Sequence, residues 1–208
     1  MAMMKTKPSF NEERFYWNFG IDHVIGLDEV GRGAFAGPIV AAGVIFKPNF
    51  KHDFLNKVND SKLVRPKLRE ELSVLIKANS VWAIESVDIE FINKYGIGKA
   101  NFEVLNKVMK KLVTKLNSIN YFAIVDGFDL KIKKQKAIIR GDTISLSIAS
   151  ASIIAKVYRD NLMKEAGEIY PNYLFAKNNG YGTLEHRNAL KIHGFCEIHR
   201  NAFISNSL

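Results

Sequence analysis

Cysteine is nearly missing from this 208-residue sequence, and long hydrophobic runs are missing altogether. The single cysteine, Cys196, excludes an internal disulfide and any zinc site built from several thiolates, and it fits a reducing compartment. No apolar stretch reaches membrane-spanning length, and residues 1–8 run into polar sequence without the apolar segment of a signal peptide. We therefore expect a cytoplasmic protein with no membrane partner.

Acidic side chains are outnumbered, with 21 Asp and Glu against 30 Lys and Arg, and the formal net charge is +9. A basic surface attracts polyanions, nucleic acid first among them. Charge alone does not separate a nucleic-acid-binding protein from a solvated basic one. The length and the hydrophobic content of 47% suit one domain with a substantial core and a small appendage.

Residues 25–38 organise the rest of the chain, and they read Ile-Gly-Leu-Asp-Glu-Val-Gly-Arg-Gly-Ala-Phe-Ala-Gly-Pro. An apolar run ends in two adjacent acids, a glycine-rich turn follows, and residues 39–46 are apolar again, which predicts strand, turn and strand. Adjacent carboxylates repel each other, and a hard divalent cation is the usual remedy. Neighbouring residues of a straight strand face opposite sides, so Asp28 and Glu29 can serve one site only if the chain bends near Glu29.

Two other interpretations of this stretch stay open. A dinucleotide-binding loop has the pattern G-x-G-x-x-G and leads from a strand into a helix. Here Gly37 comes one residue late, and Pro38 with a β-branched run follows, which indicates a strand. The second interpretation is an acidic turn that merely tolerates glycine.

The remaining sequence predicts strands alternating with helices. We expect strands at 23–28, 39–46, 81–87, 121–125 and 137–139, and helices after Pro66 and at 88–94, 99–116, 146–168 and 184–192. Residues 1–20 are expected to be a frayed start, with aromatic side chains that pack onto the body, namely Phe10, Phe15, Tyr16 and Trp17. Apolar stripes should face inward at Leu68, Leu72, Leu75 and Ile76 and, on the longer helix, at Phe102, Leu105, Val108, Met109 and Leu112. The first three strands are joined closely enough to be antiparallel, and 121–125 is typical of a covered central strand, so the fold class is α/β with a mixed sheet.

Three aspartates, Asp28, Asp126 and Asp142, each follow an apolar run and adjoin glycine. Sites collect at strand ends in sheets with covered faces, so these acids and Glu29 can converge on one edge. Four acids cannot be crowded together without cations, and two Mg²⁺ ions about 3.5–4 Å apart are the known arrangement for cutting phosphodiesters. The other acids that we considered fit structural roles, in turn or cap positions for Asp60, Asp88 and Asp129 and in a salt bridge for Asp160.

An ordered set of motifs resembles type 2 ribonuclease H, the bacterial ribonuclease HII family, over residues 22–203. The motifs are Asp-Glu-Val-Gly-Arg-Gly at 28–33 with Gly-Pro at 37–38, Asp-Ser-Lys at 60–62, Val-Asp-Gly at 125–127, Gly-Asp at 141–142, Ile-Ala-Ser-Ala-Ser-Ile-Ile-Ala-Lys-Val-Tyr-Arg-Asp at 148–160, Gly-Tyr-Gly-Thr-Leu-Glu-His at 180–186 and His-Arg-Asn-Ala-Phe at 199–203. One such motif is weak, whereas the ordered set is specific.

The resemblance implies a ribonuclease-H-like fold with a small helical C-terminal lobe, divided into an extension at 1–20, a catalytic domain at 21–170 and a lobe at 171–208. The implied activity is cleavage of RNA in RNA–DNA hybrids and of duplex DNA containing single ribonucleotides, by a monomer that uses Mg²⁺ or Mn²⁺. The metal-binding acids carry over to Asp28, Glu29, Asp126 and Asp142. Gly31, Arg32 and Gly33 carry over as the loop that reads the 2′-hydroxyl, and Tyr181 as the aromatic that stacks on the sugar.

Other contacts are weaker expectations. Lys62, Ser150 and Ser152 are candidate phosphate contacts, with turn structure and helix packing as the competing explanations. Many relatives have a lysine where this chain has Asn179, so Lys177 is a candidate substitute. The basic run 131–140 and the tail residues Arg187, Lys191 and Arg200 are candidate backbone contacts. The competing functions are a DNA junction resolvase on the same fold and a non-catalytic nucleic-acid-binding module, and the four intact acids argue against the second.

Overall fold

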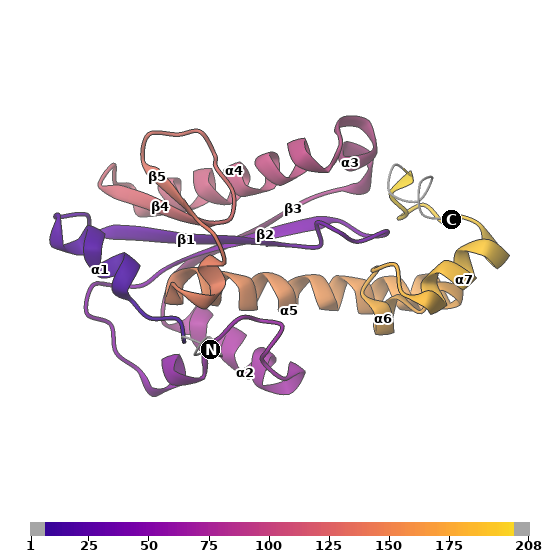
Figure 1. The fold of residues 1–208 in the computed structure, drawn as a ribbon, viewed down its shortest axis with the longest axis horizontal. Helices are drawn as coiled ribbons and strands as arrows, with labels where there is room; N and C mark the ends of the chain where they lie inside the picture. The colour runs from indigo at the N-terminus through magenta and orange to yellow at the C-terminus, as the bar shows by residue number, and fades with distance from the viewer. Residues whose placement is uncertain (1–6, 202–208) are drawn as a thin grey trace, which may run out of the picture.

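A mixed five-stranded sheet with the order β3-β2-β1-β4-β5 forms the middle of the molecule (Figure 1). This computed structural model describes residues 7–201. The strands are β1 (His23–Val30), β2 (Ile39–Ile45), β3 (Val81–Val87), β4 (Tyr121–Asp126) and β5 (Gln135–Ile138). The first three are antiparallel neighbours, as predicted, whereas β1 pairs parallel with β4 and β4 pairs parallel with β5. The carboxyl ends of β1 and β4 therefore lie side by side.

Helices cover both faces of the sheet, as predicted (Figure 1). One face carries α3 (Ile89–Tyr95) and α4 (Ile97–Leu116), and the other carries α5 (Leu146–Ile169) with α2 (Pro66–Ala78) beyond it. The short helices α6 (Phe175–Asn178) and α7 (Leu184–His193) lie at the far end of α5, and single turns of 3₁₀ helix are η1 (Asp53–Lys57), η2 (Gly141–Thr143) and η3 (Pro171–Tyr173). None of the described helices is both long and apolar enough to span a membrane.

Strand β1 is the centre of the core because its side chains alternate between the two helical layers. Ile25 and Leu27 pack with α4, and Val24 packs with Ile148 of α5. A Cβ at Gly26 would lie 2.3 Å from the Ser147 carbonyl carbon, so α5 rests directly on the β1 backbone. This close contact fixes the position of α5 against the end of β1.

Two details differ from the sequence-based expectation. The N-terminal segment forms the helix α1 (Asn11–Asn18), and the buried Glu13 ties it to the start of α5, because Glu13 Oε1 accepts hydrogen bonds from Ser145 Oγ (2.6 Å) and Ser147 N (2.8 Å). Leu75 and Phe102 are exposed, because each lies at the border of its apolar stripe. Residues 1–6 of the expected frayed start lie outside the described residues.

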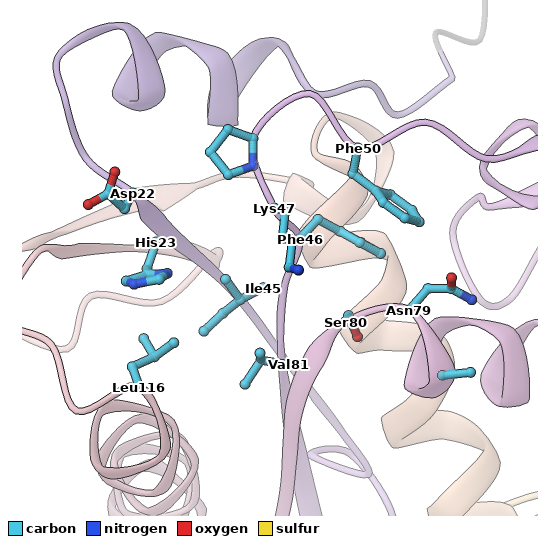
Figure 2. A pocket seen from close by; sticks show the side chains of 12 residues that line it. Asp22, His23, Ile45, Phe46, Lys47, Phe50, Asn79, Ser80, Val81 and Leu116 are labelled. Carbon is cyan, nitrogen blue, oxygen red and sulfur yellow. The ribbon is translucent and has the colours of Figure 1, made fainter.

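A cavity of about 620 Å³ opens at the end of the sheet opposite to the carboxylates (Figure 2). It is bounded by the starts of β1 and β3 and by the ends of β2 and α4, with His23, Ile45, Val81 and Leu116 around it. The lining is mainly apolar, and none of the predicted functional residues borders it.

Candidate active site

A second cavity, of about 490 Å³, lies where the carboxyl ends of β1 and β4 meet. It is lined by Asp28, Glu29, Val30, Gly31, Arg32, Gly33, Ser61, Lys62, Asp126, Asp142, Ser152, Lys156 and Tyr181. The structure thus brings together all four predicted acids, the Gly-Arg-Gly segment and the predicted tyrosine. Segments that are far apart in the sequence, such as those of Asp28 and Asp126, meet here because β1 and β4 are neighbours in the sheet.

Asp28 and Glu29 reach this cavity without the predicted bend at Glu29. The ladder to β2 continues through Glu29 opposite Ala41 and Val30 opposite Val40, and the chain turns only at Gly31, whose φ is +89°. Asp28 Oδ1 accepts a hydrogen bond from the Glu29 N–H at 2.8 Å. The longer glutamate side chain can reach the end of the strand from its own face, so the site does not need a bend within β1.

Asp126 and Asp142 come from β4 and η2, which are separated in the chain by β5 and meet at the cavity. Asp126 is the last residue of β4, and its Oδ1 accepts a hydrogen bond from the Gly141 N–H at 2.6 Å. A Cβ at Gly141 would lie 2.6 Å from Ile148 Cδ1, so a larger residue at this position would require the Ile148 side chain to shift. The hydrogen bond from Gly141 to Asp126 holds Asp142, the residue after Gly141, beside Asp126.

Burial and mutual repulsion raise the pKa of these carboxyl groups. Burial raises the pKa of Asp28 well above its usual range, and the charges of Glu29 and Asp126 add to this. Burial raises the pKa of Glu29 to about 7 although the Arg32 guanidinium, 3.9 Å away, opposes it. Burial and the charge of Asp126 raise the pKa of Asp142 to about 6. The ionised cluster is therefore short of positive charge.

This donor set fits divalent cations. Carboxylate oxygens are the ligands that Mg²⁺ and Mn²⁺ prefer. Glu29 Oε2 is buried and lacks a hydrogen-bond partner among the described residues. Within the same part of the chain, no three acidic, histidine or cysteine side chains already close on a single point, as expected of carboxylates that repel one another. A cation would relieve that repulsion.

The Gly-Arg-Gly segment is held against a buried guanidinium. Arg159 of α5 is fully buried, and it donates to the carbonyl oxygens of Ala36 (3.0 Å), Pro38 (2.9 Å) and Asn179 (2.9 Å). A Cβ at Gly31 would lie 2.2 Å from Arg159 Nε. Glycine at position 31 is thus required both by its positive φ and by the arginine behind it.

Tyr181 is half-buried and lines the cavity from the C-terminal side. The Arg159 guanidinium lies 5.5 Å from the centre of its ring, within cation–π range. Its two glycine neighbours pack against the segment after Gly33: Gly180 O accepts from Phe35 N at 2.8 Å, and a Cβ at Gly182 would lie 2.4 Å from the Phe35 ring. The Gly-Tyr-Gly turn and the Gly-Arg-Gly segment therefore form one packed unit.

The weaker candidates divide between the cavity and the interior. Lys62 and Ser152 line the cavity, and Ser152 Oγ donates to or accepts from Ser61 Oγ at 2.9 Å. Ser150 is fully buried and does not line it, so the predicted phosphate contact is not supported; its position on α5 faces the protein interior. Lys177 pairs with Glu185 (3.2 Å) and does not line the cavity either.

Arg200 corrects a second expectation. It was a candidate phosphate contact, yet it is fully buried and donates to the carbonyl oxygens of Gly31 (2.7 Å) and Gly37 (2.8 Å). Sequence patterns could not separate such an arginine from a surface arginine, because both are cationic. Arg159, Lys156 and the buried His186 and His199 were also missed as individual residues, although each falls within a quoted motif.

The acids assigned to structural roles occupy them. Asp88 caps α3 by accepting from Phe91 N (2.8 Å), and Asp60 and Asp129 each accept from a backbone N–H two residues on. Asp160 pairs with Lys156 (2.6 Å) and Arg69 (3.2 Å), as predicted. The division into an extension, a catalytic domain and a C-terminal lobe stays a prediction.

A mixed sheet of this order, with helices on both faces and acids at the ends of β1 and β4, defines the ribonuclease-H-like class of nucleases. The chain belongs to the ribonuclease HII family, whose model matches residues 25–206. It is 48% identical over 188 residues to ribonuclease HII of Clostridium tetani, covering 88% of this chain and 68% of that protein. It is 44% identical over 199 residues to ribonuclease HII of Fusobacterium nucleatum, covering 93% and 91% of the two chains.

A solved structure of ribonuclease HII from Archaeoglobus fulgidus, in a complex with PCNA, is similar with a TM-score of 0.71 and 26% identity, covering 88% of this chain and 95% of that one. Membership of the family makes this chain a metal-dependent endoribonuclease, a hydrolase of phosphodiester bonds that acts on RNA in RNA–DNA hybrids.

Proposed function

We propose that this enzyme also cuts duplex DNA at a single embedded ribonucleotide, on its 5′ side, with two divalent metal ions. The observation that carries the proposal is that four carboxylates, the Gly-Arg-Gly segment and Tyr181 border one cavity of about 490 Å³. The four carboxylates suit hydrolysis of a phosphodiester. The Gly-Arg-Gly segment and Tyr181 suit recognition of one nucleotide beside that phosphodiester.

Asp28, Glu29, Asp126 and Asp142 would hold the ions, which are Mg²⁺ or Mn²⁺. When bound, such ions lower the pKa of a water molecule and stabilise the charge of the leaving oxygen. In the hydrolysis, water attacks the phosphorus and the bond from phosphorus to the 3′ oxygen breaks, leaving a 3′-hydroxyl and a 5′-phosphate. Lys62 and Lys156, which line the same cavity, would attract the phosphate.

Recognition of the ribonucleotide is assigned to Gly31, Arg32, Gly33 and Tyr181. Without a Cβ, glycine lets backbone donors and acceptors approach a 2′-hydroxyl, which both donates and accepts. A deoxyribose would leave those polar groups without partners, at a cost of about 1–3 kcal/mol for each buried group. The Tyr181 ring, held by Arg159, would stack on the sugar and keep the ribonucleotide in register with the carboxylates.

The test uses a labelled DNA duplex with one ribonucleotide, and the matching all-DNA duplex as control. With Mg²⁺ or Mn²⁺ we expect a single cut on the 5′ side of the ribonucleotide, and with EDTA no cut. Cleavage that persists in EDTA would contradict the metal-dependent mechanism. Cleavage of all-DNA junctions without regard to ribose would favour a DNA junction resolvase, and binding without turnover would favour a non-catalytic module. The monomeric state and the cytoplasmic location stay predictions.

A further inference from the structure

Two buried histidines lie behind the Gly-Tyr-Gly turn. His186 is in the first turn of α7, His199 follows that helix, and their Nε2 atoms are 3.0 Å apart. On its other side, His186 Nδ1 lies 2.9 Å from the carbonyl oxygen of Tyr181. His199 Nδ1 lies 2.8 Å from the backbone nitrogen of Cys196. The two rings thus connect Cys196 with Tyr181 through three contacts.

The outer partners fix the protons of both rings. A carbonyl oxygen only accepts, so His186 Nδ1 must carry a proton and donate to Tyr181. A backbone N–H only donates, so His199 Nδ1 must be unprotonated and accept from Cys196. Neutral rings with these protons leave His199 Nε2 as a donor and His186 Nε2 as an acceptor. The reverse order, with His199 Nδ1–H directed at the Cys196 carbonyl 3.2 Å away, would require two protons on His186.

The surroundings keep both rings neutral. Burial lowers the pKa of His186, and burial together with the neighbouring His186 lowers the pKa of His199 to about 4. The rings of Tyr173 and Phe175 pack against the pair, with centroids 4.8–6.4 Å from the histidine rings. A second proton on His186 would place two N–H groups face to face at the 3.0 Å contact, and a second proton on His199 would face the Cys196 N–H 2.8 Å away.

The histidine pair lies between the segment that follows Gly33 and the Gly-Tyr-Gly turn, and it contacts both. His199 is bridged to Ala36, and its neighbours bond to the same segment, with Gly37 N donating to Ile198 O (2.9 Å) and Arg200 N donating to Phe35 O (2.7 Å). His186 is bonded to the Tyr181 carbonyl. A displacement of the segment after Gly33 can therefore reach Tyr181 through the two histidine rings, in addition to the direct hydrogen bond from Phe35 N to Gly180 O.

We propose that His186 and His199 are positioning residues whose single proton arrangement holds Tyr181 in register with the Gly-Arg-Gly segment and so favours single embedded ribonucleotides as substrates. This inference rests on the proposed stacking of Tyr181 on the ribonucleotide sugar. Neither histidine lines the cavity, so their effect on a bound ribonucleotide is indirect and is assigned to Tyr181.

The first test is long-range ¹H–¹⁵N NMR of the full-length protein with ¹⁵N-labelled histidine. We expect His186 as the Nδ1–H tautomer and His199 as the Nε2–H tautomer at neutral pH. The Nε2–H tautomer at His186 would overturn the inference, because Tyr181 would then lose its donor.

The second test compares kcat/KM on a single-ribonucleotide duplex with kcat/KM on a long RNA–DNA hybrid. His186→Leu should lower the ratio of the two at least tenfold. His186→Asn should restore most of it, because its amide N–H lies near the position of Nδ1–H. The matched control is His193→Asn, which should leave the ratio unchanged. A purely structural role would lower both activities in proportion.

The possible outcomes separate this inference from the proposed function. An unchanged ratio in His186→Leu, or a ratio that His186→Asn fails to restore, would overturn the inference. If Tyr181→Ala cuts the single-ribonucleotide duplex at the wild-type rate, the proposed role of Tyr181 falls and the positioning role falls with it. If Tyr181→Ala is impaired while His186→Leu is not, only the positioning role falls. Should His186→Leu fail to fold, the wild-type tautomers and the His186→Asn ratio decide.

Discussion

At the scale of single residues, Asp126 is the carboxylate most tightly fixed by backbone. It ends the central strand β4 and accepts from Gly141 N at 2.6 Å. Asp126→Asn should reduce cleavage more than tenfold, a rise in the barrier above about 1.4 kcal/mol. Binding should be kept or tightened, because one negative charge facing the phosphate is removed. Asp129→Asn is the matched control, since Asp129 serves a turn outside the cavity. Retention of more than a tenth of the wild-type rate would exclude Asp126 as a core ligand.

Tyr181 offers a separable test of ring and hydroxyl. Tyr181→Ala should slow cleavage of a single embedded ribonucleotide at least as much as cleavage of a long hybrid, in which neighbouring registers can substitute. Tyr181→Phe keeps the ring and should retain most of the activity if stacking dominates. The exposed Tyr95 on α3 provides the control substitution. Wild-type cleavage by Tyr181→Ala would contradict the stacking role.

The sequence motifs were enough to predict that the four acids and Tyr181 lie together, and all five line one cavity. The proton arrangement and burial around them could not be identified in this way. Arg200 and Ser150 show the difference: a polar residue within a matching motif can equally well face the interior, and only packing decides which.

At the scale of elements, the turn after β1 depends on one glycine more than on the other. Gly31 has a φ of +89° and faces Arg159 Nε, whereas a Cβ at Gly33 would meet nothing within 4 Å. An alanine at a left-handed position costs roughly 1–2 kcal/mol before any clash. Gly31→Ala should therefore lower the free energy of unfolding by about 2 kcal/mol or more, and Gly33→Ala should stay within about 0.5 kcal/mol of wild type. Equal losses in denaturant unfolding would contradict both the backbone strain at position 31 and the contact with Arg159.

Most strands and helices could be predicted because their hydrophobic periods are clear. The boundary of β1 was the error that mattered, since Asp28 and Glu29 were expected to end it, whereas pairing with β2 continues to Val30. A charged residue that faces a cation site can lie within a strand without facing bulk solvent. Local hydropathy does not distinguish such a residue from one that ends the strand and faces solvent. The N-terminal helix α1 was missed because its anchor, Glu13, is a polar residue that is buried through hydrogen bonds.

At the scale of the whole molecule, the carboxyl cluster should make the metal-free protein less stable as pH rises. The folded-state pKa of Glu29 is raised to about 7 from 4.5, and that of Asp142 to about 6 from 3.8. The stability that these groups contribute is thus fully present below the unfolded pKa and is lost as pH rises through the folded pKa. In EDTA, the free energy of unfolding should fall between pH 5 and pH 8 relative to Glu29→Gln, and Mg²⁺ should reduce the fall.

Comparison with Glu29→Gln cancels the contribution of the buried histidines, whose lowered pKa acts in the opposite direction. Urea unfolding at four pH values, with and without Mg²⁺, measures the effect. A difference between the two proteins that does not change with pH would contradict the raised pKa of Glu29.

The position of the basic run 131–140 also bears on nucleic-acid binding. Lys134 lies over the ring of Tyr121, where β4 begins, about 16 Å from Asp126 by the rise of a strand. Arg140 directly precedes η2 and Asp142. Arg140→Gln should therefore lower the log–log salt slope of duplex binding by roughly 0.9, the value for one phosphate on a B-form duplex, whereas Lys134→Gln should leave it unchanged. The reverse result would place the duplex at the other end of the sheet.

The place of β1 in the middle of the sheet has a consequence for biosynthesis. During translation β1, β2 and β3 leave the ribosome first, and the other edge of β1 has no neighbour until Tyr121–Asp126 has been made. An unpaired hydrophobic strand edge is an aggregation hazard, so the nascent chain is most vulnerable across the interval in which α4 is being synthesised. Ribosome pauses within that interval should lower the yield of soluble enzyme more than pauses after residue 126.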